Sequence, residues 1–175
     1  MRIFIIGFMG AGKTTIGKRL SNRLQIPFFD TDKMVEQQEG MSITQIFDLY
    51  SDNWFRQKER EILNALSLEE NAVISTGGGT PCYGDNMDFL LEHGIVIYLW
   101  LPVGTIVKRL EQSKKERPLV RNFSSSEELS RFVINKLSER QAFYQKAHIT
   151  VDAMNYNLVD ILQNLIEQMK TTGNT

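Results

Sequence analysis

The fold of this 175-residue chain follows from one stretch of sequence, Gly7-Phe8-Met9-Gly10-Ala11-Gly12-Lys13-Thr14. Its spacing, G-x-x-x-x-G-K-[ST], is that of a phosphate-binding loop, which needs a strand before it and a helix after it. Arg2 to Ile6 is rich in β-branched and aromatic residues, and apolar residues recur four apart from Lys13 to Leu24. The flanking sequence therefore fits the motif and predicts a nucleotide site in an α/β fold.

The residue types in this loop suit polyphosphate chemistry. Glycines at positions 7, 10 and 12 can take backbone angles that turn consecutive N–H groups toward phosphate oxygens at a helix N-terminus. Lys13 can bridge the β- and γ-phosphates, and the hydroxyl of Thr14 can ligate Mg²⁺. A turn that only connects strand and helix is the alternative, and the flanking elements disfavour it.

The remaining sequence alternates between strand and helix patterns. Further strands are expected over 28–30, 72–76, 95–101 and 148–151, and helices around 34–35 and over 43–68 with a possible break at 52–53, over 103–110, from 124–126 to about 147, and over 158–169. Such alternation predicts a parallel sheet with right-handed crossovers. No break in composition divides the chain, so we expect a single domain over 1–175.

Two acidic residues follow the second predicted strand. A helix over 13–25 descends roughly 19 Å and a five-residue strand climbs back roughly 16 Å, so Asp30 and Asp32 return to the level of the phosphates. Residues i and i+2 of an extended segment share one side, so both carboxylates can face the nucleotide. One can hold Mg²⁺ through water and the other can accept the proton of an attacking hydroxyl; helix N-caps are the alternative.

A glycine triplet, Gly77-Gly78-Gly79, follows the predicted strand over 72–76. It can form a shelf without side chains in the crevice where doubly wound sheets bind ligands, although a flexible turn is the commoner interpretation of such a pattern. No acid closes this strand, so the usual Walker B carboxylate is missing. Metal binding then depends on Asp30 and Asp32.

Six motifs stand in fixed order along the chain: residues 7–15, Asp30-Thr31-Asp32, Phe55-Arg56-Gln57-Lys58-Glu59, Thr76-Gly77-Gly78-Gly79, Arg117-Pro118-Leu119 and residues 139–144. In this order and spacing they resemble shikimate kinases over about residues 2–168. The resemblance implies a P-loop NTPase-like three-layer fold with a central five-stranded parallel sheet, related to nucleoside monophosphate kinases. It also implies transfer of the γ-phosphoryl group of ATP to the 3-hydroxyl of shikimate, on the route to aromatic amino acids.

The resemblance assigns the nucleotide side of the site. Asp32 resembles the carboxylate that binds the accepting hydroxyl, and Asp30 resembles the one that reaches Mg²⁺ through water beside Thr14. Lys13, Asp32 and Arg117 are then the catalytic residues. Binding of ATP falls to Gly10, Ala11, Gly12, Lys13, Thr14, Thr15, Arg109 and Arg117, with Arg109 resembling the residue that stacks on adenine.

The shikimate side is assigned in the same way. Arg56 and Arg140 resemble two guanidinium groups that clamp the carboxylate of shikimate, a task that suits their planar forks. Gly78 resembles a backbone contact to substrate. Glu59 lies three residues after Arg56 and can orient it on one helix face; an exposed ion pair is the alternative without the resemblance.

A lid and a substrate-binding segment are also implied, over about 110–124 and 32–62. Lys108 to Arg121 contains six basic and two acidic residues, a balance that suits folding over a polyphosphate. Arg117 resembles the lid arginine that meets the transferring phosphate; a solvated charge is the alternative.

Composition limits the remaining possibilities. With 20 basic against 21 acidic residues, the chain is a poor candidate for a dedicated nucleic-acid binder. Its longest apolar run, over 95–101, is too short to cross a membrane, and its single cysteine, Cys82, allows no intrachain disulfide. Cys82 has no base nearby in sequence, so we interpret it as structural. We expect a cytoplasmic monomer with ATP and shikimate as partners.

Two other functions share parts of this pattern. A related small-molecule kinase, such as gluconate kinase, has the phosphate loop and a substrate with a carboxylate. A nucleotide-dependent regulatory protein without turnover is the second alternative. The combination of Asp30-Thr31-Asp32, three glycines and two arginines favours shikimate.

Overall fold

The structure, a computed structural model, describes residues 1–113, 119–120, 123 and 125–172. Its centre is a five-stranded sheet in the order β2-β3-β1-β4-β5, in which every pair of neighbours is parallel. The strands are β1 (Arg2–Ile6), β2 (Phe28–Asp30), β3 (Ala72–Ser75), β4 (Ile95–Trp100) and β5 (Ile149–Asp152). The predicted fold class, a three-layer P-loop architecture, is confirmed.

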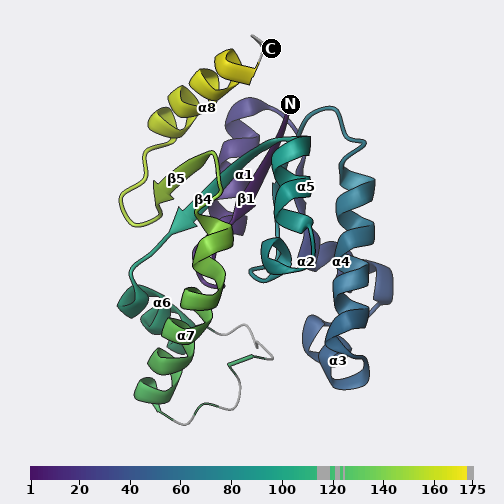
Figure 1. Cartoon of the computed structure of the whole chain (residues 1–175), viewed down its shortest axis with the longest axis vertical. Helices are drawn as coiled ribbons and strands as arrows, with labels where there is room; N and C mark the ends of the chain where they lie inside the picture. Colours follow the sequence, from purple (N-terminus) through teal and green to yellow (C-terminus); the bar gives the residue numbers. More distant parts are fainter. Residues whose placement is uncertain (114–118, 121–122, 124, 173–175) are drawn as a thin grey trace.

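Helices cover both faces of the sheet (Figure 1). One face carries α1 (Lys13–Leu24), α6 (Val103–Glu111) and α8 (Leu158–Thr172). The other carries α2 (Thr31–Glu39), α3 (Ile43–Leu49), α4 (Asp52–Leu66), the short 3-10 helix η1 (Thr80–Cys82) and α5 (Asn86–His93). The long helix α7 (Ser126–Tyr144) contributes residues to the cores on both sides.

Successive side chains of each strand point to opposite faces of the sheet, and this produces the two cores. Ile3 and Ile5 of β1 lie in the cluster under α1 and α8, and Phe4 and Ile6 lie in the cluster under α4 and α5. All four are fully buried, which explains why the strand reads as a continuous apolar run. β4 pairs with the central strand β1 and is buried along most of its length.

Element boundaries differ from the predictions at several places. The long helical pattern is broken at Tyr50–Ser51 and not at Asp52-Asn53, because the Ser51 hydroxyl accepts a hydrogen bond from the Trp54 N–H at 3.2 Å and caps α4. Helix α7 ends at Tyr144, before the predicted Ala147. Helix α5 and η1 were not predicted. Within the described ranges, no helix has the length and apolar content of a membrane span.

Candidate functional site

The chain leaves β1 through a loop that only glycine accommodates at three positions. The φ angles are 141° at Gly7, 83° at Gly10 and 94° at Gly12, all in the region that disfavours side chains. A Cβ atom on Gly7 would also lie 2.7 Å from the carbonyl oxygen of Leu99. Gly12 caps α1, so the loop presents its backbone amides at a helix N-terminus, where anions bind.

A cavity of about 340 Å³ opens over this loop at the carboxyl edge of the sheet. The side chains of Lys13, Thr14, Asp30, Asp32 and Arg109 line it. The Nζ of Lys13 donates to the carbonyl oxygens of Gly7 at 2.9 Å and Phe8 at 3.1 Å, and Nη1 of Arg109 donates to that of Gly10 at 3.1 Å. Side chains from α1, β2, α2 and α6 therefore converge on one space.

Asp30 caps helix α2, the alternative that its sequence left open, and it also contacts Thr14 of the phosphate loop. Its Oδ1 accepts the Lys33 N–H at 3.4 Å as the N-cap of α2, and its Oδ2 accepts the hydroxyl of Thr14 at 2.7 Å. A carboxylate and a hydroxyl at one place suit Mg²⁺, which usually keeps several waters and takes further ligands from substrate phosphates. Among the described residues, no three or more His, Cys, Asp or Glu side chains form a group that could hold a metal ion.

The backbone of the glycine triplet lies close to side chains of the predicted site. A Cβ on Gly77 would lie 2.6 Å from Oε1 of Glu59 and 2.7 Å from Oδ1 of Asp32, and one on Gly79 would lie 3.0 Å from the guanidinium of Arg56. Gly78 packs on the phosphate loop, where its Cβ would lie 3.2 Å from the backbone nitrogen of Met9. A side chain on Gly77 would thus require Glu59 or Asp32 to shift, and one on Gly78 or Gly79 would be a tight fit.

A second cavity, of about 230 Å³, lies beyond this shelf. Gly79, Arg56 from α4 and Arg140 from α7 line it, together with Asp52 and Tyr83. Gly78 lines the first cavity and Gly79 the second, so the two cavities meet at the shelf.

Glu59 holds Arg56 in this second cavity. Its Oε2 accepts from Nη1 of Arg56 at 2.6 Å, and its Oε1 accepts the hydroxyl of Thr80. Glu59 is fully buried, so the alternative of an exposed helical ion pair is wrong. Burial raises the pKa of Glu59 against the opposing effect of Arg56. Burial also lowers the pKa of Arg56, but Glu59 and Asp52 together raise it above its ordinary value.

Arg140 is a buried cation with unused hydrogen-bonding capacity. The residue is 8% exposed, and its guanidinium carbon lies 5.4 Å from the centre of the Phe8 ring. Its Nη1 is buried and has no hydrogen-bond partner among the described residues. Because a buried donor is rarely left without a partner, this atom favours an anionic ligand in the second cavity.

Cys82 also lines the second cavity, but its chemistry is unfavourable for attack. Burial raises the pKa of its thiol to about 11. The thiolate, which is the reactive form, is then scarce near neutral pH. The structure thus agrees with a structural role.

Some functional positions lie outside these observations or were missed. Arg117 and most of the predicted lid lie outside the described residues. Thr80 and Tyr144 were not predicted, yet Thr80 donates to Glu59, and the hydroxyl of Tyr144 donates to the Gly78 carbonyl oxygen at 2.6 Å. Only their positions in the sequence could have indicated these two residues: Thr80 directly follows the glycine triplet, and Tyr144 is four residues after Arg140.

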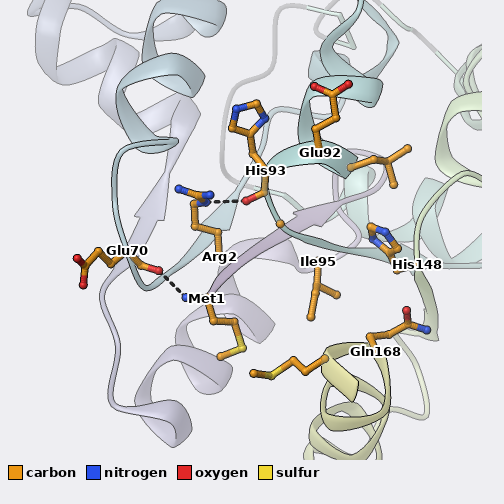
Figure 2. Close-up of a pocket in the computed structure, with 11 residues that line it drawn as sticks. Met1, Arg2, Glu70, Glu92, His93, Ile95, His148 and Gln168 are labelled. Carbon is orange, nitrogen blue, oxygen red and sulfur yellow. Dashed lines mark hydrogen bonds between the residues drawn. The ribbon is translucent and has the colours of Figure 1, made fainter. Parts of the chain in front are cut away.

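A larger cavity, of about 590 Å³, lies at the amino ends of the strands and contains none of the predicted site residues. Figure 2 shows it, with Arg2 donating from Nε to the carbonyl oxygen of His93 at 2.6 Å. The same guanidinium donates to the carbonyl oxygens of Ser67 and Glu69 near the end of α4. Arg2 therefore joins the ends of α4 and α5, a structural task.

Comparisons with known proteins agree with this geometry. The family described as shikimate kinase matches residues 9–170. A shikimate kinase of Azobacteroides pseudotrichonymphae is 41% identical over 169 residues, 96% of this chain and 99% of the relative. The crystal structure of shikimate kinase from Bacteroides thetaiotaomicron has a TM-score of 0.88 at 36% identity, covering 95% of this chain and 98% of that one.

Two further structures bear on the substrate. Shikimate kinase from Acinetobacter baumannii in complex with shikimate has a TM-score of 0.84 at 32% identity, covering 98% of this chain and 93% of that one. A gluconokinase from Sinorhizobium meliloti reaches a TM-score of 0.58 at 15% identity, covering 99% and 94%. The second likeness shows a shared fold alone.

Proposed function

The chain belongs to the shikimate kinase family and is a phosphotransferase that uses ATP to phosphorylate shikimate; from this premise we propose how its residues divide the reaction. The observation that carries the proposal is the meeting of two cavities at the Gly78–Gly79 shelf. One is built for polyphosphate, and the other is lined by the partly buried Arg56 and the buried Arg140. A donor and a carboxylate-bearing acceptor can thus lie on opposite sides of one backbone segment.

ATP occupies the first cavity, with its phosphates on the amides of residues 10–15. Lys13 neutralises charge on the β- and γ-phosphates, and Arg109 faces the adenine side. Thr14 and, through water, Asp30 hold Mg²⁺, which neutralises phosphate charge when bound. The hydrogen bond of 2.7 Å between Thr14 and Asp30 supports this pairing.

Shikimate occupies the second cavity, with its carboxylate between Arg56 and Arg140 and its ring against Gly78. The carboxylate of Asp32 accepts the proton of the 3-hydroxyl while that oxygen forms its bond to the γ-phosphorus. The bond from the γ-phosphorus to the β–γ bridging oxygen breaks, and ADP leaves. Alignment and electrostatics carry most of this reaction, since phosphoryl transfer needs little covalent chemistry from protein.

A coupled assay of ATP consumption tests the proposal. Turnover should require shikimate and should be absent with gluconate or nucleoside monophosphates. Lys13→Ala should abolish it, whereas Lys18→Ala, an exposed position on the same helix, should not change it. Undiminished shikimate-dependent turnover in Lys13→Ala would contradict the ATP site, and turnover with gluconate would contradict the substrate.

We also propose that the enzyme acts as a monomer in the cytoplasm. Its single cysteine is partly buried and has a raised thiol pKa, which suits a reducing compartment. Sedimentation at assay concentration tests the monomer, since a mass near 20.1 kDa is expected.

A further inference from the structure

Tyr144 is a fully buried side chain of α7 that bonds to the shelf between the two cavities. Its hydroxyl donates to the Gly78 carbonyl oxygen at 2.6 Å. It is four residues after Arg140 on α7, so the two side chains share one face of the helix. The guanidinium of Arg140 also lies against Gly78, since a Cβ there would be 3.5 Å from Nη1.

The hydrogen bond from Tyr144 orients both the carbonyl of Gly78 and the N–H of Gly79. A peptide unit is planar and trans, so fixing the carbonyl of Gly78 also fixes the direction of the Gly79 N–H. Other parts of the shelf are held from elsewhere: the Gly77 N–H donates to the hydroxyl of Thr31 at 3.1 Å, and Asn86 donates to the Thr80 carbonyl oxygen at 2.9 Å. Of these contacts, the one from Tyr144 joins the shelf to the helix that carries Arg140.

Packing leaves the ring of Tyr144 little freedom. It stacks on Tyr98 of β4, with ring centres 5.0 Å apart and planes inclined by 28°. β4 pairs with β1, the strand that leads into the phosphate loop, so the ring rests on an inner strand of the sheet. The ring packing thus fixes the position of the Tyr144 hydroxyl relative to the shelf.

We propose that Tyr144 is a positioning residue for substrate recognition, which sets the spacing between Arg140 and the Gly78–Gly79 backbone so that both contact one shikimate molecule. Tyr144 itself does not touch the substrate. The inference rests on the proposed placement of shikimate between Arg140 and the shelf.

The test compares Tyr144→Phe with Tyr98→Phe. Each change removes one hydroxyl from a stacked pair of rings, but no hydrogen bond from the Tyr98 hydroxyl occurs among the described residues. Shikimate and ATP are titrated separately by calorimetry, well below the melting temperature of each variant. Tyr144→Phe should weaken shikimate binding by about 5- to 30-fold, because it removes the bond to Gly78, leaves that carbonyl unsatisfied and removes the interaction of the hydroxyl with Arg140. ATP affinity should change less than about twofold, and Tyr98→Phe should bind both ligands like the wild type.

A double-mutant cycle with Arg140→Lys separates positioning from general stability. If Tyr144 acts by aligning Arg140 with the shelf, Tyr144→Phe should cost clearly less shikimate affinity in the Arg140→Lys background. Independent, additive losses would overturn the proposal, as would wild-type shikimate affinity in Tyr144→Phe or equal losses in both phenylalanine variants. Arg140→Ala serves as a reference: wild-type shikimate affinity there would overturn the placement of shikimate itself, a failure distinct from that of Tyr144 alone.

Discussion

Gly77 is packed too closely for a side chain to fit without rearrangement, although it is not in a left-handed conformation. Gly77→Ala would place a Cβ within 2.7 Å of Asp32 and of Glu59. Relief of such an overlap typically costs about 1–3 kcal/mol, and here it displaces the proposed base. We expect kcat/KM for shikimate to fall roughly 10- to 100-fold.

Gly104→Ala is the matched control, because a Cβ there meets nothing within 4 Å. Steady-state kinetics on both variants, with melting curves to verify folding, completes the test. Equal activity in the two variants would show that the shelf tolerates a side chain.

Short sequence distances made part of this residue-level arrangement predictable. The i, i+3 spacing of Arg56 and Glu59 places both side chains on one helix face, which is enough to predict that they pair. The burial of the pair could not be predicted, because it depends on Thr80, which is 21 positions away from Glu59. For the same reason the triplet predicted a surface without side chains but not the groups that exclude them.

Elements with strong periodicity were predictable, and those defined by caps or long-range packing were not. Helix α1 has the predicted bounds because its apolar residues recur regularly after a fixed loop. The division between α3 and α4 depends on which of several polar residues becomes an N-cap, and Ser51 does. Helix α5 is only eight residues long, and its position is fixed by tertiary contacts.

Asn86 is one of those contacts, and it joins three elements. Its Oδ1 accepts from Nη1 of Arg60 on α4 at 2.7 Å, while its Nδ2 donates to Thr80 in η1 at 2.9 Å. Asn86→Ala should lower the free energy of unfolding by about 1–3 kcal/mol, because it leaves buried polar groups without partners. Asn64→Ala, on the exposed side of α4, should change it by less than about 0.5 kcal/mol. Urea denaturation measures both, and a similar loss in the two variants would contradict this linking role.

At the scale of the whole molecule, the alternation of strands and helices predicted a parallel α/β sheet. The order β2-β3-β1-β4-β5 was not predicted, since a local pattern does not say which strands pair. The motifs still indicated the site, because parallel strands all end at one edge. The division into core, substrate-binding segment and lid stays a prediction.

The stability of the molecule should depend on pH through His148. Its Nδ1 accepts the Val96 N–H at 3.0 Å at the edge of β4, so protonation of that nitrogen would break the bond. Burial lowers the pKa of His148 below its ordinary 6.5. The native state therefore binds fewer protons than the unfolded state, and the stabilisation, complete above 6.5, is lost as pH falls from 6.5 through the lowered pKa of the native state.

Urea unfolding at about pH 7.5 and about pH 5.5 measures this effect. The wild type should lose more stability between the two values than His148→Gln, in which the remaining titrating groups are unchanged. Identical losses would assign the pH dependence to other groups.

The last prediction concerns the proposed binding of ATP in one cavity and of shikimate in the other. Arg56 and Arg140 come from different helices and line one cavity, and neither lines the cavity over the phosphate loop. If both hold one carboxylate, removing either leaves a buried charge partly unpaired, a loss of roughly 2–5 kcal/mol. Arg56→Ala and Arg140→Ala should thus weaken shikimate binding about 30-fold to a few thousand-fold.

ATP affinity measured without shikimate should stay near that of the wild type. Arg131→Ala, on an exposed position of α7, should bind both ligands normally. Calorimetric titration of each ligand decides: loss of ATP affinity in the two cavity variants would mean that the arginines serve the nucleotide, because only a shared carboxylate confines the damage to shikimate.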